Sequence, residues 1–361
     1  MKLISHIIKK EIKQLKRNNF FIENRFNYLR LDNNERLLPL KKKDLKSFKF
    51  SIKDDDIMGY TDIHNTYKNL AKFLKVDIDQ LLIAAGSDIA IRSVFETFVS
   101  KLDTIVLQSP SYAMSQVYAK MFGAKIKYFK ANKNFMVEPK SVYRQIDNKT
   151  KLVIIENPNG FVGNKFKIRE IEKFAKNLLA KNILLLIDEA YFYVENNSFD
   201  KKYLLKKYPN VIISQTFSKG HGLAGVRFGY LISNSKIMNY LKKVRPMHEI
   251  SSLSAKAANW VFEKSHMHKE FRKSIKQSKE YLMRELLLLK IKYKMTTANF
   301  FLIYAPNFGK TKNISNKLKQ KKILIRRPFD RKDLKGWTRI TVGSLSDSKK
   351  FILALKSIIK R

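Results

Sequence analysis

The chain has 361 residues, of which 44% are hydrophobic, so it is long enough to bury a sizeable core in one large or two moderate domains. It carries 73 Lys and Arg against 31 Asp and Glu, a net charge of +42, and the lysines are spread along the whole chain. That spread favours lysine-rich solvated surfaces over a dedicated nucleic-acid interface, although the positive field would attract anionic small molecules. The lack of cysteine excludes disulfides, thiolate zinc sites and cysteine nucleophiles.

The apolar and histidine patterns narrow the class of protein further. No apolar run reaches the length of a membrane span. Residues 1–21 alternate apolar with basic side chains, which favours an amphipathic helix packed on the protein body or on a second subunit over a secretory signal. The six histidines show no metal-ligand spacing. We therefore expect a cytoplasmic protein without a metal site.

From about residue 62, strand and helix patterns alternate. Short apolar runs predict strands at 81–84, 104–107, 124–128, 152–155, 183–187, 211–214 and 228–232. Apolar residues at helical spacing predict helices at 66–75, 112–122 and 169–180, and one more that is capped by Ser87 or Asp88. This alternation predicts an α/β fold with a mostly parallel sheet covered by helices on both faces, where ligands gather at the carboxyl ends of the strands.

The pattern changes after residue 247. Residues 252–290 read as long, basic helix, residues 300–304, 323–325 and 339–342 as strands, and residues 351–359 as a final helix. We expect a smaller α+β domain at 247–361, a large ligand-binding domain at 56–246, and an N-terminal segment at 1–55 that packs on the small domain and on a partner subunit.

The most informative motif is Ser218-Lys219 in a glycine-broken loop. Lysine forms Schiff bases, and a carboxylate such as Asp188, at the end of an apolar strand, can hold a pyridinium nitrogen in its protonated form. Tyr191, three residues further on, could hydrogen-bond a ring oxygen. Taken singly, Lys219 could be one more surface lysine and Asp188 a helix cap; together they indicate a site for pyridoxal phosphate.

A phosphate requires its own anion site. The turn Gly86-Ser87-Asp88 follows a strand and opens a helix, so its backbone N–H groups and the helix dipole can hold an anion. With Ser218 and Arg227 this turn would form a phosphate cup.

Three other side chains have a possible ligand role. Tyr112 follows a buried strand and could stack on a pyridine ring, although a packing role is equally compatible with the pattern. Arg339 alternates with apolar residues in a strand, and Arg326 is a second candidate for bidentate capture of carboxylate or phosphate; an exposed strand arginine is the alternative for both. We assign no role to His221, which lies between two glycines of a loop.

An ordered set of motifs resembles the fold-type I, class I/II pyridoxal-phosphate aminotransferases, and most of all the histidinol-phosphate aminotransferases. The resemblance covers about residues 31–360, and its motifs, in the family's order, are Leu31-Asp32-Asn33-Asn34-Glu35, Gly59-Tyr60, Gly86-Ser87-Asp88, Ser109-Pro110-Ser111-Tyr112, Asp188-Glu189-Ala190-Tyr191, Thr216-Phe217-Ser218-Lys219, Leu223-Ala224-Gly225-Val226-Arg227 and Arg339-Ile340-Thr341-Val342-Gly343.

The resemblance implies a role for each motif. It makes Lys219 the Schiff-base lysine, Asp188 the partner of the ring nitrogen and Tyr191 the partner of the phenolic oxygen. It implies that the phosphate is bound by Ser87, Asp88, Ser218 and Arg227. It implies that Arg339 binds the acidic group of the substrate, and we expect Arg326 and Asn34 as further substrate-binding residues. It also implies a homodimer in which Tyr60 reaches the coenzyme phosphate of the neighbouring subunit.

One motif departs from the family pattern. The family has Asn-Asn-Pro-Thr-Gly, or close variants, where this chain has Asn159-Gly160-Phe161-Val162-Gly163. Gly160 stands where the asparagine that contacts the phenolic oxygen is found, so Asn159 or Asn157 would have to serve instead. The loss of one such hydrogen bond costs roughly 1–3 kcal/mol, which bears on the reaction more than on coenzyme binding.

Three functions fit these observations. The first is a transaminase that moves an amino group from an amino acid, by family analogy glutamate, to an oxo acceptor that carries a phosphate or phosphonate. The second keeps the coenzyme but breaks another bond, as a decarboxylase of a phosphorylated amino acid. The third is a basic nucleic-acid-binding protein on an inactive scaffold, whose binding would be steeply salt-dependent. We favour the first.

Overall fold

The computed structural model describes residues 7–13, 15, 24–194, 201–264, 266–305, 312–329 and 331–359. Its helices are α2 (Lys10–Lys13), α3 (Lys42–Ser51), α4 (Asp55–Met58), α5 (His64–Leu74), α6 (Ser87–Phe98), α7 (Ala113–Met121), α8 (Pro139–Tyr143), α9 (Ile168–Leu179), α10 (Lys201–Lys207), α11 (Ser235–Leu241), α12 (Ser252–Phe262), α13 (His266–Leu288), α14 (Lys312–Gln320) and α15 (Leu345–Ile359). Its strands are β1 (Leu29–Leu31), β2 (Leu81–Ala84), β3 (Thr104–Ser109), β4 (Lys125–Lys130), β5 (Thr150–Glu156), β6 (Leu184–Asp188), β7 (Val211–Thr216), β8 (Gly229–Ser233), β9 (Tyr293–Met295), β10 (Phe300–Tyr304), β11 (Ile323–Ile325) and β12 (Trp337–Thr341).

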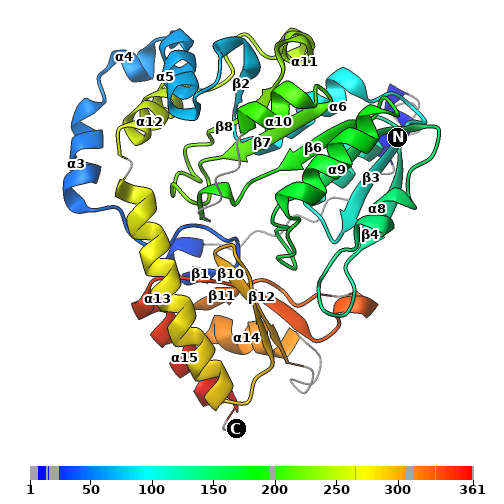
Figure 1. Cartoon of the computed structure of the whole chain (residues 1–361). Helices are drawn as coiled ribbons and strands as arrows, with labels where there is room; N and C mark the ends of the chain where they lie inside the picture. Colours follow the sequence, from blue (N-terminus) through cyan, green and yellow to red (C-terminus); the bar gives the residue numbers. More distant parts are fainter. Residues whose placement is uncertain are drawn as a thin grey trace.

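A seven-stranded sheet forms the larger part of the molecule, with the strand order β2-β8-β7-β6-β5-β3-β4 (Figure 1). From β7 to β4 all neighbouring strands are parallel, whereas β8 is antiparallel to both β2 and β7. The predicted mostly parallel sheet is therefore confirmed, and the seven strands expected between residues 81 and 232 all form.

Both faces of this sheet are buried, as its continuous apolar strands predict. In β5, Val153 and Ile155 join the core beneath α5, α9 and α12, while Leu152 and Ile154 join the core beneath α6 and α7. Along each central strand the side chains alternate in this way, so that the last residue of β5 and the last residue of β6 lie on the same face of the sheet.

A second body contains the three-stranded antiparallel sheet β12-β10-β9 and the parallel pair β1-β11, which share one core with α13 and α15 (Figure 1). β1 comes from the N-terminal region and pairs with β11, which follows it by nearly three hundred residues. β1 thus lies against the C-terminal part of the chain.

Two details of the expected elements need correction. The helix expected to run through 252–290 is interrupted, because α12 ends at Phe262 and α13 begins at His266. The N-cap of α6 is Gly86, and neither Ser87 nor Asp88 caps that helix; the Asp88 carboxylate instead accepts a hydrogen bond from the Tyr118 hydroxyl (2.7 Å). Of the helix expected at 1–21, only α2 and a few neighbours belong to the described residues, and α2 contacts α7.

Candidate functional site

The chemically distinctive side chains meet at the carboxyl edge of the large sheet. Glu156 ends β5 and pairs in register with Asp188, which ends β6. Asp188 in turn pairs with Ser214 in β7, and the chain leaves β7 into the loop that carries Ser218 and Lys219. Parallel strands bring their carboxyl ends to one edge, which is why residues far apart in the sequence share this place.

Lys219 is partly buried, and its Nζ donates to the carbonyl oxygen of Asn33 (2.8 Å). Burial, followed by the nearby positive charge of Arg339, lowers the pKa of Lys219 to about 8, while Glu35 acts in the opposite direction. An amine that gives up its proton near neutral pH can attack a carbonyl carbon.

Asp188 is 6% exposed, and its Oδ1 accepts from the backbone N–H of Ala190 (3.1 Å). Burial, followed by the neighbouring carboxylate of Glu156, raises the pKa of Asp188 to about 8. Among the described residues it forms no ion pair. A cationic ligand atom at this carboxylate would therefore be bound strongly.

Ser218, Arg227 and the N-terminus of α6 form a group that we call the anion cradle. Arg227 is exposed, has a left-handed backbone (φ 61°), and donates to the Ser218 hydroxyl (3.4 Å) and to a backbone carbonyl. Thr216 donates to the same Ser218 hydroxyl (3.0 Å). The guanidinium reaches the N-terminus of α6 only because residue 86 is glycine, since a Cβ there would overlap Arg227 Nη2. The resulting cradle combines a helix N-terminus, a hydroxyl and an arginine with no carboxylate partner among the described residues.

A second cationic group faces the site from β12. Arg339 is 6% exposed; its Nη1 donates to the Gly160 carbonyl (2.5 Å) and its Nη2 to the Asp32 carbonyl (2.8 Å). Its Nε is buried without a partner. The Arg326 guanidinium lies 4.7 Å from the centroid of the Phe161 ring, and that of Arg339 lies 5.7 Å from the same centroid. Two arginines held without a neutralising carboxylate favour an anionic ligand.

The segment 32–35 closes the site from the N-terminal side. Asn34 is fully buried in a left-handed conformation, and its Nδ2 donates to the Tyr191 hydroxyl (2.8 Å). Its Oδ1 accepts from the Thr341 hydroxyl (3.1 Å). Arg25 fixes the segment from outside, because it forms ion pairs with Asp32 (2.6 Å) and Glu35 (2.7 Å).

The turn that departs from the family pattern is tightly bonded. Asn159 was expected as a substitute contact to the ring, but both ends of its side-chain amide already form hydrogen bonds within the fold. Its Oδ1 accepts from the N–H groups of Phe161 and Val162. Its Nδ2 donates to the Pro110 carbonyl (3.0 Å) and to Glu156 (3.2 Å). The side-chain oxygen of Asn157 accepts from the Phe166 N–H (2.8 Å). The Asn159 amide is therefore fully used within the fold, and the Asn157 side-chain oxygen is used as well.

Glu156 is the residue that sequence reasoning missed. Its carboxylate is buried and accepts hydrogen bonds from Tyr112 N, Gly160 N and Asn159 Nδ2. The signal was present, because Glu156 is an acidic residue at the end of an apolar strand, the same pattern that singled out Asp188.

Two of the tyrosines predicted to contact the coenzyme, Tyr112 and Tyr60, lie in different surroundings. Tyr112 is partly buried beside Asp188 and the N-terminus of α6, and burial followed by the Asp88 charge raises the pKa of its hydroxyl. Tyr60 is 87% exposed and stacks on His248 (ring centroids 4.1 Å apart). No contact joins Tyr60 to the other site residues of the same chain within the described ranges.

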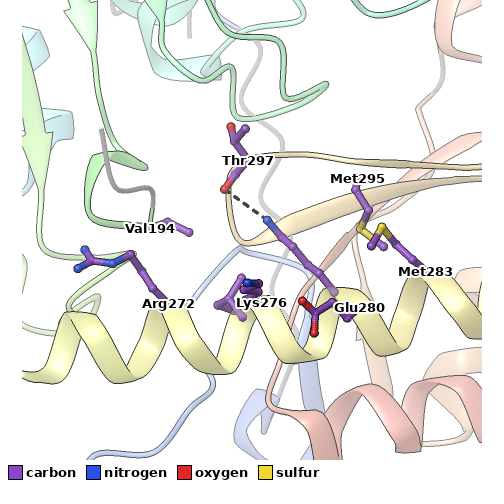
Figure 2. Close-up of a pocket in the computed structure, with 9 residues that line it drawn as sticks. Val194, Arg272, Lys276, Glu280, Met283, Met295 and Thr297 are labelled. Atoms are coloured by element: carbon purple, nitrogen blue, oxygen red, sulfur yellow. Dashed lines mark hydrogen bonds between the residues drawn. The ribbon is translucent and has the colours of Figure 1, made fainter. Parts of the chain in front are cut away.

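A separate cavity of about 370 Å³ lies along α13 and is not part of this site. Figure 2 shows it between Arg272 and Lys276 of α13, Val194 and the turn at Thr297, where Lys279 Nζ donates to the Thr297 carbonyl (3.3 Å). None of the predicted site residues lines it. Over the described ranges, no group of acidic and histidine side chains could hold a metal ion, and none of the helices combines the length and apolar character needed to span a bilayer.

Comparison with known proteins assigns this geometry to one family. The sequence pattern of the family described as aminotransferase class I and II matches residues 27–355. The chain is 32% identical over 301 residues to a histidinol-phosphate aminotransferase of Pelagibacter ubique, covering 81% of this chain and 82% of that protein. It is 30% identical over 361 residues to one of Caldanaerobacter subterraneus subsp. tengcongensis, covering 99% and 100% of the two chains. A histidinol-phosphate aminotransferase of Sinorhizobium meliloti, solved in complex with pyridoxal-5'-phosphate, has the same fold: the TM-score is 0.87 at 21% identity, over 98% of both chains.

Proposed function

The chain belongs to the class I and II aminotransferases, and on that basis we propose that it uses pyridoxal phosphate to move an amino group between an amino acid and a phosphorylated oxo compound of the histidinol-phosphate type. The observation that carries the proposal is the layout of charge. An amine with a lowered pKa lies near Arg339 and Arg227. Arg326 lies beside Arg339 at the Phe161 ring, and the buried carboxylates of Asp188 and Glu156 end the neighbouring strands.

The residues present fit this coenzyme. Gly86 leaves the space through which Arg227 reaches the helix N-terminus, and that cradle suits a phosphate. Asp188 is a buried carboxylate without an ion-pair partner among the described residues, and it suits a protonated ring nitrogen. When bound, pyridoxal phosphate supplies an aldehyde for the amine and an electron-withdrawing ring.

Within this proposal each side chain has a defined task. Lys219 Nζ would hold the coenzyme and would move a proton as general base and acid. Asp188 holds the proton of the ring nitrogen, and Tyr191 with Asn34 supports the phenolic oxygen. The phosphate is bound by Ser87, Ser218 and Arg227, with Asp88 fixing the turn through Tyr118. Tyr112 lies against the ring.

Arg339 and Arg326 bind the acidic groups of the substrates. The buried Nε of Arg339 has no hydrogen-bond partner, which leaves a donor for a carboxylate or phosphate oxygen. Asn34 borders the same space through its contact with Thr341. Asn159, by contrast, is assigned here to holding the turn that carries Gly160.

The decisive experiment is an assay of the purified protein with pyridoxal phosphate, histidinol phosphate and 2-oxoglutarate. We expect glutamate to form, histidinol without its phosphate to react far more slowly, and Lys219→Ala to be inactive.

Arg339→Gln should lower kcat/KM by roughly 30-fold or more, because the loss of one partner of a buried charge contact costs about 2–5 kcal/mol. Arg92→Gln, which removes the partner of Glu96 on the surface of α6, is the matched control.

Other outcomes would redirect the assignment. Release of carbon dioxide from a phosphorylated amino acid without formation of an oxo acid would favour the decarboxylase. A colourless protein whose visible spectrum does not change with pyridoxal phosphate, and which retains no coenzyme after borohydride treatment, would refute the proposal as a whole.

We also propose a homodimer in which Tyr60 completes the partner's site. Tyr60 is 87% exposed, and Met58, Ile57 and Met247 around it are 84%, 70% and 87% exposed. Such apolar side chains are expected at a protein interface. Mixed dimers of Lys219→Ala and Tyr60→Phe chains test this: each variant alone has little activity, and mixing restores one complete site. The expected cytoplasmic location stays a prediction.

The domain limits are the last part of the proposal. The pairing of β1 with β11 supports an N-terminal segment, up to residue 55, on the smaller domain. The boundary between the large and the small domain was expected at residue 246. We propose that it lies near His266, because α12 packs on α5 and shares the core of the large sheet.

A further inference from the structure

Glu156 joins two loops at the edge of the large sheet. Its Oε1 accepts from the backbone N–H of Tyr112, in the loop after β3. Its Oε2 accepts from Gly160 N (2.9 Å) and from Asn159 Nδ2 (3.2 Å), in the turn after β5. The carboxylate is 6% exposed, so water does not compete for these bonds. All three partners are N–H donors, which is the arrangement that an ionised carboxylate requires.

The absence of a side chain at residue 160 lets the turn pack closely on Tyr191 and Glu156. A Cβ on Gly160 would lie 3.2 Å from the Tyr191 hydroxyl and 3.5 Å from Glu156 Oε2. A longer side chain would therefore press against both. The Gly160 carbonyl, on the other side of the same turn, accepts from Arg339 Nη1 (2.5 Å). Glu156 thus fixes a turn that also fixes the arginine assigned to the substrate.

Glu156 also lies next to the residue assigned to the ring nitrogen. It pairs in register with Asp188, and both side chains are on the same face of the sheet. The charged groups that act on Glu156 and Asp188 are each other, Glu189, Lys219 and Arg339. The unusual turn and the buried acid therefore belong to one arrangement around the ring.

We propose that Glu156 is a positioning residue for the coenzyme ring, whose carboxylate ties Tyr112 to the Gly160 turn in place of the asparagine, proline and threonine side chains that this turn lacks. The inference rests on the proposed function, because it presumes that pyridoxal phosphate binds between Tyr112 and Asp188. It assigns no proton transfer to Glu156.

Substitution by glutamine tests the idea with little change in volume. An amide offers one acceptor oxygen, and its NH₂ group would face an N–H donor, so at least one loop loses its bond. We expect Glu156→Gln to bind pyridoxal phosphate at least tenfold more weakly, as measured by titration of the protein stripped of coenzyme. We also expect a weaker visible circular dichroism signal per bound coenzyme, because the ring is held less firmly. Glu156→Asp, which keeps the charge on a shorter side chain, should fall between these values.

Glu189→Gln is the matched control. Glu189 is 2% exposed and is bonded to Gln215 (2.6 Å) and Lys201 (3.6 Å), so its removal also costs stability, but it contacts neither Tyr112 nor the Gly160 turn. We expect Glu189→Gln to lower the melting temperature and to keep the coenzyme affinity and the dichroism signal of the wild type. If Glu156→Gln does not fold, Gly160→Ala tests the same turn without removing a charge: its Cβ would lie only 3.2 Å from the Tyr191 ring and hydroxyl, so the turn has to shift and coenzyme binding should weaken as well.

The outcomes separate the inference from the function on which it rests. Failure of the wild type to bind pyridoxal phosphate refutes the proposed function. Normal binding by the wild type, with equal affinity and dichroism in Glu156→Gln, refutes the role of Glu156 alone. Equal losses in Glu156→Gln and Glu189→Gln would reduce that role to general stability and overturn the inference too.

Discussion

Unbalanced charge around one amine is the central feature at the scale of single residues. Lys219 lies near Arg339 and Arg227, and burial withdraws its ammonium group from water. Both effects favour the neutral amine. Glu35 partly opposes them from the N-terminal segment. The chain thus holds the amine that we propose as the nucleophile close to its neutral state.

A pH dependence follows for the attachment of coenzyme. Only the neutral amine attacks an aldehyde, and the pKa of Lys219 is lowered to about 8, so the rate of covalent attachment should rise with pH and level off above about 8 instead of above its ordinary value of 10.5. Borohydride trapping at short times, over a pH series, measures this rate. Glu35→Gln should move the midpoint to lower pH, since Glu35 raises the pKa. A midpoint near 10 in the wild type would contradict the geometry of the site.

At the scale of single residues, the sequence indicates which side chains belong to the site better than it indicates their hydrogen-bond partners. Asp188, Lys219 and Arg227 stand out because each follows or precedes a strand pattern that can be recognised locally. The saturation of Asn159 and the contacts of Glu156 depend on loops that are brought together only by folding. An amide or a carboxylate can be recognised in a sequence, but the bonds already used inside the fold cannot.

At the scale of elements, the phosphate cradle depends on the close passage of β8 beneath the N-terminus of α6. Gly229, the first residue of β8, lies so near that a Cβ would overlap Ser87 N and the carbonyl carbon of Gly86. These contacts are with backbone atoms, which cannot move aside as a flexible side chain can. The glycine therefore sets the distance between the strand and the helix that supplies the anion site.

Gly229→Ala should push α6 away from β8. We expect a loss of roughly 1–3 kcal/mol in the free energy of unfolding from overpacking, and a weaker affinity for pyridoxal phosphate because Ser87 is displaced. Gly225→Ala is the matched control, because Gly225 is exposed and has nothing within 4 Å of an added Cβ. It should stay within about 0.5 kcal/mol of the wild type. Urea unfolding and coenzyme titration measure the two effects, and equal behaviour of the two variants would rule out the close-passage argument.

Elements were predictable where their hydrophobic pattern was long enough. The central strands and the three-residue β11 carry continuous apolar runs, whereas β1 and β9 each have a basic residue in the middle of only three residues and gave no signal. The antiparallel direction of β8 could not be read from its sequence, because strand direction is decided by pairing with β2 and β7. The break between α12 and α13 lies in a stretch with no proline or glycine to announce it.

At the scale of the whole molecule, two buried histidines lie where α13 leaves the large sheet. His221, in the lysine loop, is fully buried and stacks on Phe217 (ring centroids 3.8 Å apart). His268, in the first turns of α13, lies edge-on to it (4.0 Å) and is 7% exposed. All four ring nitrogens lack hydrogen-bond partners. This contact joins the two bodies of the protein through groups that must stay neutral.

Acid should therefore loosen the junction. Burial, followed by the charges of Arg272 and Arg36, lowers the pKa of His268 to about 4. Burial, followed by His268 and Arg36, lowers the pKa of His221 well below 6.5. Because the unfolded chain binds protons from about pH 6.5 downwards and the folded chain does not, these residues make the free energy of unfolding fall as pH decreases from about 6.5 to about 4. Each contributes a slope of at most ~1.4 kcal/mol per pH unit.

A difference measurement isolates this effect from the carboxylates. Asp188 and Glu156 have raised pKa values, about 8 and about 7, so without coenzyme they act in the opposite sense and make stability fall as pH rises through the range from about 4 to 8. The free energy of unfolding of His268→Phe and of the wild type is measured with urea at pH 5 and at pH 7.5, on protein stripped of coenzyme. Because both proteins contain the two carboxylates, the contribution of the carboxylates cancels in the difference. We expect the variant to lose less stability on acidification than the wild type. His64→Phe, at an exposed position on α5, is the control and should leave the pH dependence of stability unchanged. If both variants change this pH dependence equally, the buried histidine pair is not its source.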